Sequence, residues 1–366
     1  MVNPSQKNIA ILGAGLLGRL LALELAKVNC DVHVYDRYGI DNPRSAAFVA
    51  AAMLAPLAES VSTERSIVEM GYYSLKRWPV ILQQLEKNVF FQQEGSLIVW
   101  HQQDQSSALH FKNQLQRITQ EIPNIPLPEL LNKTSLNALE PHLSHQFEEG
   151  IYLPEEGQLD NRELLDALYH QGVQLGIHFH WNHMIDIATF DQSAFDHIID
   201  CRGMGSHQDV NSLRGVRGEV VRVFAPEVNL LRPIRLIHPK YPIYIAPKRD
   251  HVYVIGATEI ESEDDSPMSV RSALELLSAA YTVHSGFAEG RILESGAQCR
   301  PSFKNNLPQI IHNDSKLMHV NGLYRHGYLI APAIVDSVLA ILLNNSERLA
   351  QQFHLGNQET SHAHLC

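Results

Sequence analysis

The N-terminal region contains the feature that most restricts the fold, a glycine-rich turn between two short apolar segments. Residues 8–12 predict a strand, residues 13–18 read GAGLLG, and a helical pattern continues to about Lys27. The segment DVHVYDR predicts a second strand that ends at Asp36, 23 positions after Gly13. In such a turn the first glycine permits a tight bend, the second lets the backbone approach a pyrophosphate, and the third lets helix and strand pack closely. The order of these elements predicts a dinucleotide-binding domain; the alternative is a glycine-rich turn that binds nothing.

The composition is typical of a globular protein that is long enough for two domains. The 366 residues are 45% hydrophobic and 19% charged, and the net charge of −11 disfavours nucleic acid or an anionic membrane as a partner. The four cysteines form no CxxC pair, which argues against a disulfide framework or a structural zinc site. The apolar run from Ile9 to Leu25 lacks a basic leader, and we expect no other segment to span a bilayer. These features predict a cytoplasmic protein.

The nucleotide-binding pattern is interrupted and returns later in the chain. Residues 195–206 predict a strand that enters a glycine-rich turn, and residues 322–343 predict a turn followed by an apolar helix. Between them, four alternating segments from Gly218 onward predict one antiparallel sheet, followed by a helix and then a turn-rich segment, GAQCRPSFKNNLPQI. The fold class is therefore α/β, with a two-domain α+β architecture: a split Rossmann-like domain and an interleaved antiparallel-sheet substrate domain. The predicted ranges are 1–85, 145–215 and 318–350 for the nucleotide-binding domain, 86–144 and 216–317 for the substrate-binding domain, and 351–366 for a flexible tail.

The turn at residues 322–327 is a candidate binding site in its own right. It places Arg325 between glycines and directly ahead of an apolar helix. Such a turn exposes backbone N–H groups at a helix N-terminus, which favour an anionic or electron-rich group. The guanidinium offers a planar fork that suits a carboxylate or a phosphate.

The split of the nucleotide domain favours a bound flavin over a nicotinamide, whose domain is usually continuous in sequence. The segments GAGLLG, AAAMLAP, RGEVVRV, RPIRLIHPKYPIYIAP, VIGATEIES, the pair Arg300-Pro301, and NGLYRHGYLIAP together cover nearly the whole chain apart from its tail. In these segments the chain resembles the D-amino-acid-oxidase superfamily of flavoproteins, and most closely the glycine oxidases of thiamine biosynthesis. It departs from the pattern at Ala52, where relatives often have glycine.

The resemblance implies non-covalent FAD, with Asp36 and Arg37 at the adenosine ribose and Met184 at the adenine. The alanine-rich segment that begins at Arg44 would lie against the diphosphate and flavin ring; the residues alone fit a well-packed helix start equally well. The implied cofactor-binding residues are Gly13, Gly15, Leu16, Leu17, Gly18, Asp36, Arg37, Ala46, Ala47, Ala51, Ala52, Met53, Met184, Leu323, Tyr324, Arg325, His326, Gly327, Tyr328 and Leu329.

The resemblance also implies how a substrate is held. Arg325 is the first choice for a clamp on the substrate carboxylate, Arg300 is the second cationic contact, and Tyr244 closes the pocket. The reaction would transfer a hydride from the amino acid to FAD and needs no catalytic side chain. His326 could be proposed as a general base, but we favour the interpretation that its side chain points away from the substrate.

Three further features have candidate roles. Glu259 could meet the substrate amine, but a structural role at a sheet edge is favoured. Cys299 lies where some relatives carry a flavin-linked cysteine, and we expect no covalent bond there. The stretch HFHWNH at residues 178–183 has metal-like spacing, but its position favours a solvated loop, so no metal is predicted.

The expected function is an FAD-dependent oxidase of glycine, sarcosine and small D-amino acids that uses dioxygen, releases hydrogen peroxide and supplies an imine to thiazole formation. The alternatives are a sarcosine- or D-amino-acid-specific oxidase or dehydrogenase, and a non-catalytic flavin-binding subunit. The family suggests a homotetramer, with no nucleic-acid or membrane partner.

Overall fold

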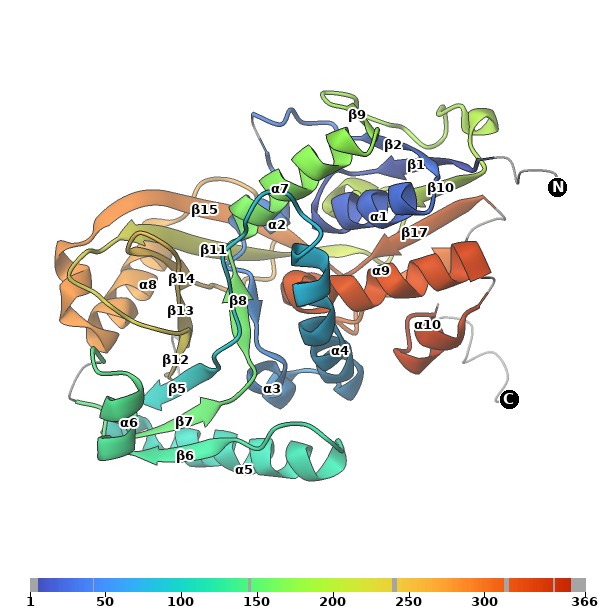
Figure 1. Cartoon of the computed structure of the whole chain (residues 1–366). Coiled ribbons are helices and arrows are strands. Elements are labelled where there is room, and N and C mark those ends of the chain that lie inside the picture. The colour runs from blue at the N-terminus through green and yellow to red at the C-terminus, as the bar shows by residue number, and fades with distance from the viewer. Residues whose placement is uncertain are drawn as a thin grey trace.

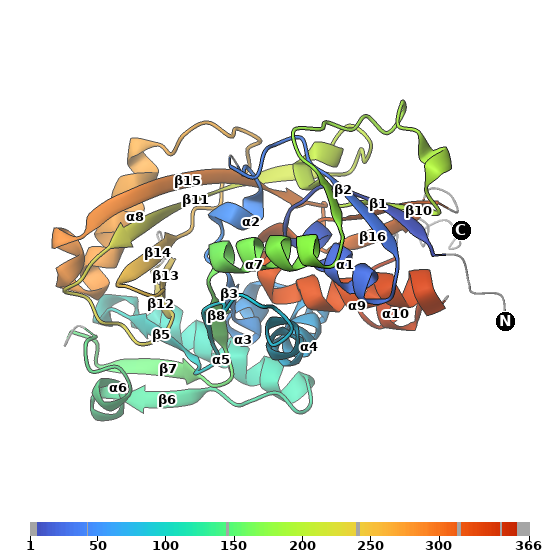
Figure 2. The same ribbon diagram turned by 45° about the horizontal axis from the view of Figure 1, so that its top comes forward.

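A computed structural model describes residues 6–41, 43–143, 146–238, 242–312, 316–344 and 346–356 (Figure 1). In this part of the chain the strands form sheets of six, eight and three strands. The six-stranded sheet and its helices lie on one side of the molecule, and the eight-stranded sheet lies on the other (Figures 1 and 2).

The six-stranded sheet confirms the predicted strand–turn–helix–strand order. Its parallel strands carry their apolar residues alternately to the two faces, as the period of two in a strand requires. Ile9 and Ile11 face the helix-covered side, whereas Ala10 and Leu12 pack on the opposite side. The sheet order is β16 (Gln309–His312), β17 (Leu317–Asn321), β10 (His197–Asp200), β1 (Asn8–Leu12), β2 (Asp31–Tyr35) and β9 (His178–His180), and only β16 runs antiparallel to its neighbour.

Four helices supply most of the core on this side of the molecule. These are α1 (Leu16–Lys27), α4 (Arg65–Leu82), α7 (Asn161–Gln174) and α9 (Gly327–Asn344). Asp160 caps the N-terminus of α7, where its carboxylate accepts hydrogen bonds from the N–H groups of Arg162 and Glu163, at 2.8 and 3.0 Å. The short helix α10 (Arg348–Gln352) follows α9.

The apolar helix α9 corrects the expectation that no later segment is long and apolar enough to span a bilayer. The stretch Tyr324–Asn344 meets both criteria, and it is the one such helix among the described residues. However, 67% of its most apolar window is buried inside the protein, where it packs against α1 and α4. This packing makes α9 a core helix. The cytoplasmic location stays a prediction.

The eight-stranded sheet contains the four predicted antiparallel strands, but as a whole it is mixed. The predicted strands are β11 (Arg214–Phe224), β12 (Ile234–Ile237), β13 (Ile243–Pro247) and β14 (Val252–Gly256). Beyond them, β12 pairs in parallel with β5 (Ser96–Trp100), which corrects the prediction of a purely antiparallel sheet. The sheet continues through β7 (Glu149–Leu153) to β6 (Glu129–Asn132).

The first part of the segment predicted as turn-rich, residues 296–302, belongs to a long edge strand, β15 (Arg291–Ser302), whereas residues 303–308 lie in the turn before β16. It pairs with β11 from Arg214 opposite Ser302 to Phe224 opposite Arg291. An edge strand has one row of backbone groups without a ladder partner, so it tolerates Pro301 and glycine, which normally indicate a turn. Strands β11 and β15 extend from the eight-stranded sheet toward the six-stranded sheet (Figure 2).

The remaining elements connect or cover the two large sheets. The three-stranded sheet joins β3 (Met53–Leu54), β8 (Gly157–Leu159) and β4 (Phe91–Gln92). The other helices are α2 (Ala46–Val49), α3 (Pro56–Glu59), α5 (Gln105–Glu121), α6 (Lys133–Leu139) and α8 (Val270–Val283). Short 3₁₀ turns occur at Ser60–Ser62, Gln102–Asp104, Gln192–Ala194, Gly203–Ser206, Ser285–Glu289 and Tyr324–His326.

Three parts of the predicted domain division differ from the observed elements. Strand β7 lies in the eight-stranded sheet, although its residues fall in the range expected for the nucleotide-binding domain. Strand β16 lies in the six-stranded sheet, although its residues fall in the range expected for the substrate-binding domain. The predicted tail begins too early, because Phe353 and Leu355 are buried in the same core as α1 and α9. Residues 357–366 of that tail lie outside the described residues. The division into two functional domains stays a prediction.

Candidate active site

A cavity of about 1310 Å³ lies where the two large sheets approach each other. Its wall includes the turn after β1, the segment around α2, and the turn ahead of α9. Strands β11, β13 and β15 of the eight-stranded sheet supply the other side. The cavity is thus bounded by both sheets, and it is large enough for an extended ligand.

The glycine turn after β1 is built as its sequence predicts. Gly13 has a φ of +101°, which favours glycine, and its N–H donates to the Tyr35 carbonyl at 2.7 Å. A Cβ on Gly18 would lie 1.9 Å from the Gly13 carbonyl oxygen, so this glycine allows the helix to pack against the turn. A Cβ on Gly15 would have its nearest neighbour at 3.9 Å. Gly15 therefore lines the open cavity, whereas Gly18 serves packing.

The N-terminus of α1 fits a bound pyrophosphate. Its cap residue, Gly15, has no side chain to accept the first N–H groups, and the first turn carries no acid. Leu16 and Leu17 both line the cavity. Nearby, the Asp36 carboxylate accepts from the N–H groups of Ala14 and Tyr38 at 2.8 and 2.9 Å. Each carboxylate oxygen keeps a further lone pair, so Asp36 can fix the turn and still accept from a ribose hydroxyl.

The alanine-rich segment lies along the cavity and is not a well-packed helix start. Helix α2 has only four residues, and none of them is buried. Ala52 has a φ of +54°, in the left-handed region, which glycine adopts more readily than alanine. The buried amino group of Lys248 donates to the carbonyls of Ala51 and Leu159, at 2.9 and 2.8 Å, and to the Gln158 side chain at 3.0 Å. These hydrogen bonds from Lys248 fix the position of the alanine-rich segment.

The Arg325 turn forms an ion network at one end of the cavity. The Arg325 Nε lies 2.9 Å from Glu59 Oε2, and its Nη1 donates to Glu259 Oε2 at 2.8 Å. Its Nη2 donates to the Ser62 hydroxyl at 2.6 Å. Glu259 also accepts from the Tyr324 hydroxyl at 2.5 Å, as the expected structural role of this acid implies. Nη1 and Nη2 of Arg325 therefore donate hydrogen bonds to the protein, whereas Nε is close to Glu59 Oε2 but forms no hydrogen bond with it.

The charges in this network are tightly coupled. Burial alone would raise the pKa of Glu59, but Arg325 and Arg235 outweigh it and lower the pKa to about 2. The second guanidinium lies 3.1 Å from Glu59 Oε1. His326 is buried, and this burial lowers its pKa to about 4 although Glu59 lies 3.6 Å away. Glu59 is therefore ionised and His326 neutral at pH 7.

Arg300 and Tyr244 reach the cavity from strands β15 and β13. A Cβ on Gly218 would lie 2.2 Å from Cζ of Arg300, so the guanidinium lies directly over this glycine of β11. Its Nη1 donates to the Thr258 carbonyl at 3.1 Å. A Cβ on Gly256 would similarly lie 2.8 Å from the Tyr244 hydroxyl. Two glycines thus leave room for the two polar side chains.

The Cys299 thiol is buried and directed at protein groups. Its Sγ lies 3.6 Å from the Ser262 carbonyl and 3.5 Å from the Asp264 carbonyl. Burial raises the pKa of the thiol, which keeps it protonated at neutral pH.

The structure brings the predicted site residues together, with Gly18 as the exception. Every other residue predicted to contact the cofactor or substrate lines this one cavity. Sequence reasoning missed Glu59, Arg235 and Trp181, which line it as well. An acid at the end of a short helix and an arginine on a strand carry no local signal of a site. Among the described residues, the buried Trp181 Nε1 has no hydrogen-bond partner, so a ligand acceptor could fill that position.

These features define the class of protein: a flavin-binding oxidoreductase with its cavity between a Rossmann-like sheet and a second sheet. The family model for FAD-dependent oxidoreductases, DAO, matches residues 8–336. The chain therefore belongs to the DAO family, and it is an enzyme whose cofactor is FAD.

Several relatives align along nearly the whole chain. A protein named as a thiamine biosynthesis oxidoreductase, ThiO, from Rhizobium etli is 34% identical over 337 residues, which cover 92% of this chain and 96% of that protein. Glycine oxidase from Geobacillus kaustophilus is 25% identical and covers 93% of each chain. The crystal structure of glycine oxidase from that organism has a TM-score of 0.79 at 23% identity, covering 93% of this chain and 96% of its own. This structural likeness supports the fold.

Proposed function

We propose that the chain is an FAD-dependent oxidase of glycine and other small amines or amino acids, including sarcosine and small D-amino acids. The products are an imine, which water converts to glyoxylate and ammonia when glycine is the substrate, and hydrogen peroxide. Support comes from the Rhizobium ThiO and the Geobacillus glycine oxidase, which align over more than nine-tenths of the chain. By the same likeness, we assign the imine to thiazole formation in thiamine biosynthesis.

The observation that carries the proposal is the guanidinium of Arg300. A substrate carboxylate needs a cation that is not already neutralised by a protein acid. Arg325 is paired with Glu59 and Glu259, and Arg235 is paired with Glu59. Among the described residues, Arg300 has no carboxylate partner, and its recorded hydrogen bond is to a backbone carbonyl. We therefore give Arg300 the primary carboxylate contact and Arg325 the second, the reverse of the order inferred from sequence.

The remaining side chains orient the substrate. FAD, when bound, accepts the hydride from the substrate Cα, and dioxygen reoxidises it. Burial raises the pKa of the Tyr244 hydroxyl, so this group stays a neutral hydrogen-bond donor beside Arg300. Neutral His326 and ionised Glu59 are used within the ion network, and we assign neither as the acid or base of the reaction. Binding and alignment are thus the main contribution of the protein.

The test is peroxide release by the purified flavoprotein when glycine is added under air. Peroxide formed in proportion to glycine consumed supports an oxidase. Flavin reduction by glycine without peroxide would indicate a dehydrogenase of the same fold. Turnover confined to sarcosine or to a D-amino acid would replace the glycine assignment. No flavin reduction by any small amino acid would leave only a non-catalytic flavin-binding role. The homotetramer implied by the family stays a prediction, which sedimentation of the holoprotein would test.

A further inference from the structure

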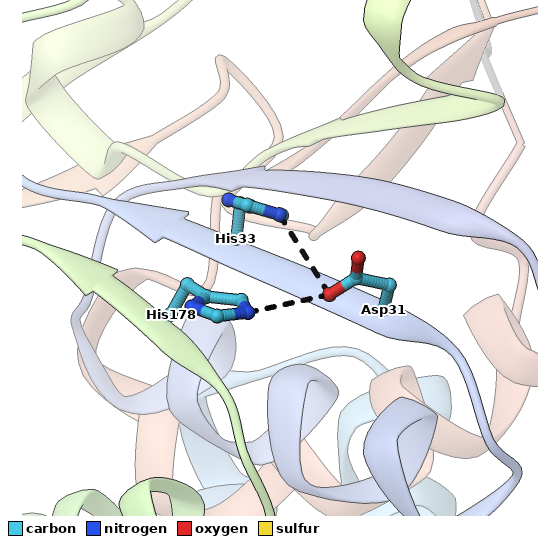
Figure 3. Close-up of side chains that lie close together, drawn as sticks. All are labelled: Asp31, His33 and His178. Carbon is cyan, nitrogen blue, oxygen red and sulfur yellow. Dashed lines mark ion pairs between the residues drawn. The ribbon is translucent and has the colours of Figure 1, made fainter.

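Three possible metal ligands meet on the outer face of the six-stranded sheet, away from the glycine turn. Asp31 begins strand β2, His33 follows two residues later on the same face, and His178 lies on the neighbouring strand β9. The register places His33 directly opposite His178. Figure 3 shows both imidazoles directed at the same carboxylate oxygen of Asp31. Residues 178–180 thus form a strand, which corrects the prediction of a solvated loop.

The distances suit a shared ion better than direct hydrogen bonds. His33 Nε2 lies 3.7 Å and His178 Nε2 lies 3.6 Å from Asp31 Oδ1, and the three donor atoms lie within 4.8 Å of one another. A hydrogen bond between such groups would be shorter, about 2.7–3.2 Å. Ligands around a tetrahedral zinc ion, with bonds of about 2.0–2.2 Å, are separated by about 3.4 Å. A small movement of these side chains would therefore complete three positions of a metal site.

A fourth histidine prepares His33 for this role. The His33 Nδ1 lies 3.1 Å from the His180 Nε2. The His33 tautomer that carries its proton on Nδ1 donates to His180 and leaves its Nε2 lone pair free for a metal. Such a second hydrogen bond commonly orients metal-ligating histidines. The ring of His180 also stacks on Tyr35, which lines the cavity, with 4.4 Å between the centroids.

The site is reachable from solvent. The side chains of His33, Asp31 and His178 are 24%, 43% and 56% exposed, so an ion can enter from solvent. No other group of three potential ligands in comparable proximity occurs in the described part of the chain.

We propose that Asp31, His33 and His178 bind one divalent transition-metal ion of the zinc class, with water in the remaining coordination positions. Two imidazoles and one carboxylate are ligands that Zn²⁺, Ni²⁺ and Cu²⁺ accept. The site lies at the N-terminal half of β2, whereas the glycine turn contacts the C-terminal end of this strand at Tyr35, so metal binding is separate from the proposed oxidase reaction.

The experiment measures Zn²⁺ binding to the holoprotein by isothermal titration calorimetry. All proteins carry His362→Asn and His364→Asn, which remove the two histidines of residues 357–366. One equivalent of Zn²⁺ is expected to bind, and His33→Asn or His178→Asn should weaken binding more than about tenfold, the lower end of the effect of losing a supporting residue. The matched control is His170→Asn, because His170 forms an exposed pair with Asp166 at 3.2 Å without a third ligand.

A second measurement identifies the ligands. The spectrum of bound Cu²⁺ in electron paramagnetic resonance should show two coordinated nitrogens in the parent protein and one in the His178→Asn variant. FAD content and melting temperature without metal verify that each variant is folded. Equal Zn²⁺ binding by the His33, His178 and His170 variants would overturn the proposal, as would the absence of a one-to-one complex in the parent protein.

Discussion

Replacing Arg300 with glutamine should weaken substrate binding while the flavoprotein stays folded. Arg300 can give a substrate carboxylate two charge-assisted hydrogen bonds, each worth about 1.5–3 kcal/mol when buried. Because the side chain is only half-buried, we expect about 2–3 kcal/mol in total, roughly a 30- to 150-fold fall in kcat/KM. The assay is steady-state peroxide formation with glycine, and the loss should appear mainly as a higher KM.

Gly218→Ala provides an independent version of the same perturbation. Its Cβ would occupy the space of the Arg300 guanidinium, which would have to shift although no charge is removed. This variant should therefore raise the KM for glycine and retain FAD.

Arg325→Gln is the comparison that separates the two arginines. It leaves the half-buried Glu59 without one of its two arginine partners, and breaking such a pair costs about 3 kcal/mol of stability. We expect a lower melting temperature together with any change in KM. If Arg325→Gln raised KM at unchanged stability while Arg300→Gln left KM unaltered, the assignment of the primary clamp to Arg300 would be refuted.

Three further predictions address the ion network and the cofactor cavity. The pKa of Glu59 is about 2 in the folded protein and about 4.3 when unfolded, so its charge adds about 3 kcal/mol of stability that is present above about pH 4.3 and is lost as the pH falls toward 2. The difference in unfolding free energy between the wild type and Glu59→Gln should therefore decrease from about pH 4.3 to about pH 2. A difference that stays constant over this range would contradict the coupling of Glu59 to its arginines. Gly15→Ala should lower FAD affinity with little change in apoprotein stability, whereas Gly18→Ala should destabilise the apoprotein itself. Urea unfolding of both apoproteins measures this difference. Equal losses of apoprotein stability in the two variants would contradict the separate roles of the two glycines. Lys248→Met should lower both stability and FAD retention, because it leaves buried carbonyl acceptors without a donor. Each unsatisfied group costs about 1–3 kcal/mol. Normal FAD content in a variant of unchanged stability would contradict the role of Lys248 in positioning the alanine-rich segment.

The N-terminal strand–turn–helix–strand unit could be predicted because its determinants are local. Gly13 adopts the positive φ that the tight turn needs, and Gly18 meets the Gly13 carbonyl only five residues away. The capping acid Asp160 and the strand at residues 96–100 follow equally short-range patterns. Here the sequence neighbours of a residue are also its structural neighbours.

The parts that could not be predicted depend on contacts between distant segments. Glu59 acquires its low pKa from Arg235 and Arg325, which approach it only after both sheets are assembled. Strand β15 contains glycine and proline, and its pairing with β11 outweighs those local turn signals. His178 likewise joins Asp31 only through the register of β9 with β2. The spacing of residues along the chain carries little information about such long-range contacts.

The central claim is that this cavity lets a small amino acid reduce the bound flavin. An anaerobic titration of the holoprotein with glycine, followed by visible absorption, tests it most directly. We predict that stoichiometric glycine bleaches the flavin bands and that the Arg300→Gln variant requires a much higher glycine concentration. An unchanged flavin spectrum in the wild type at saturating glycine, sarcosine and D-alanine would contradict the proposed function.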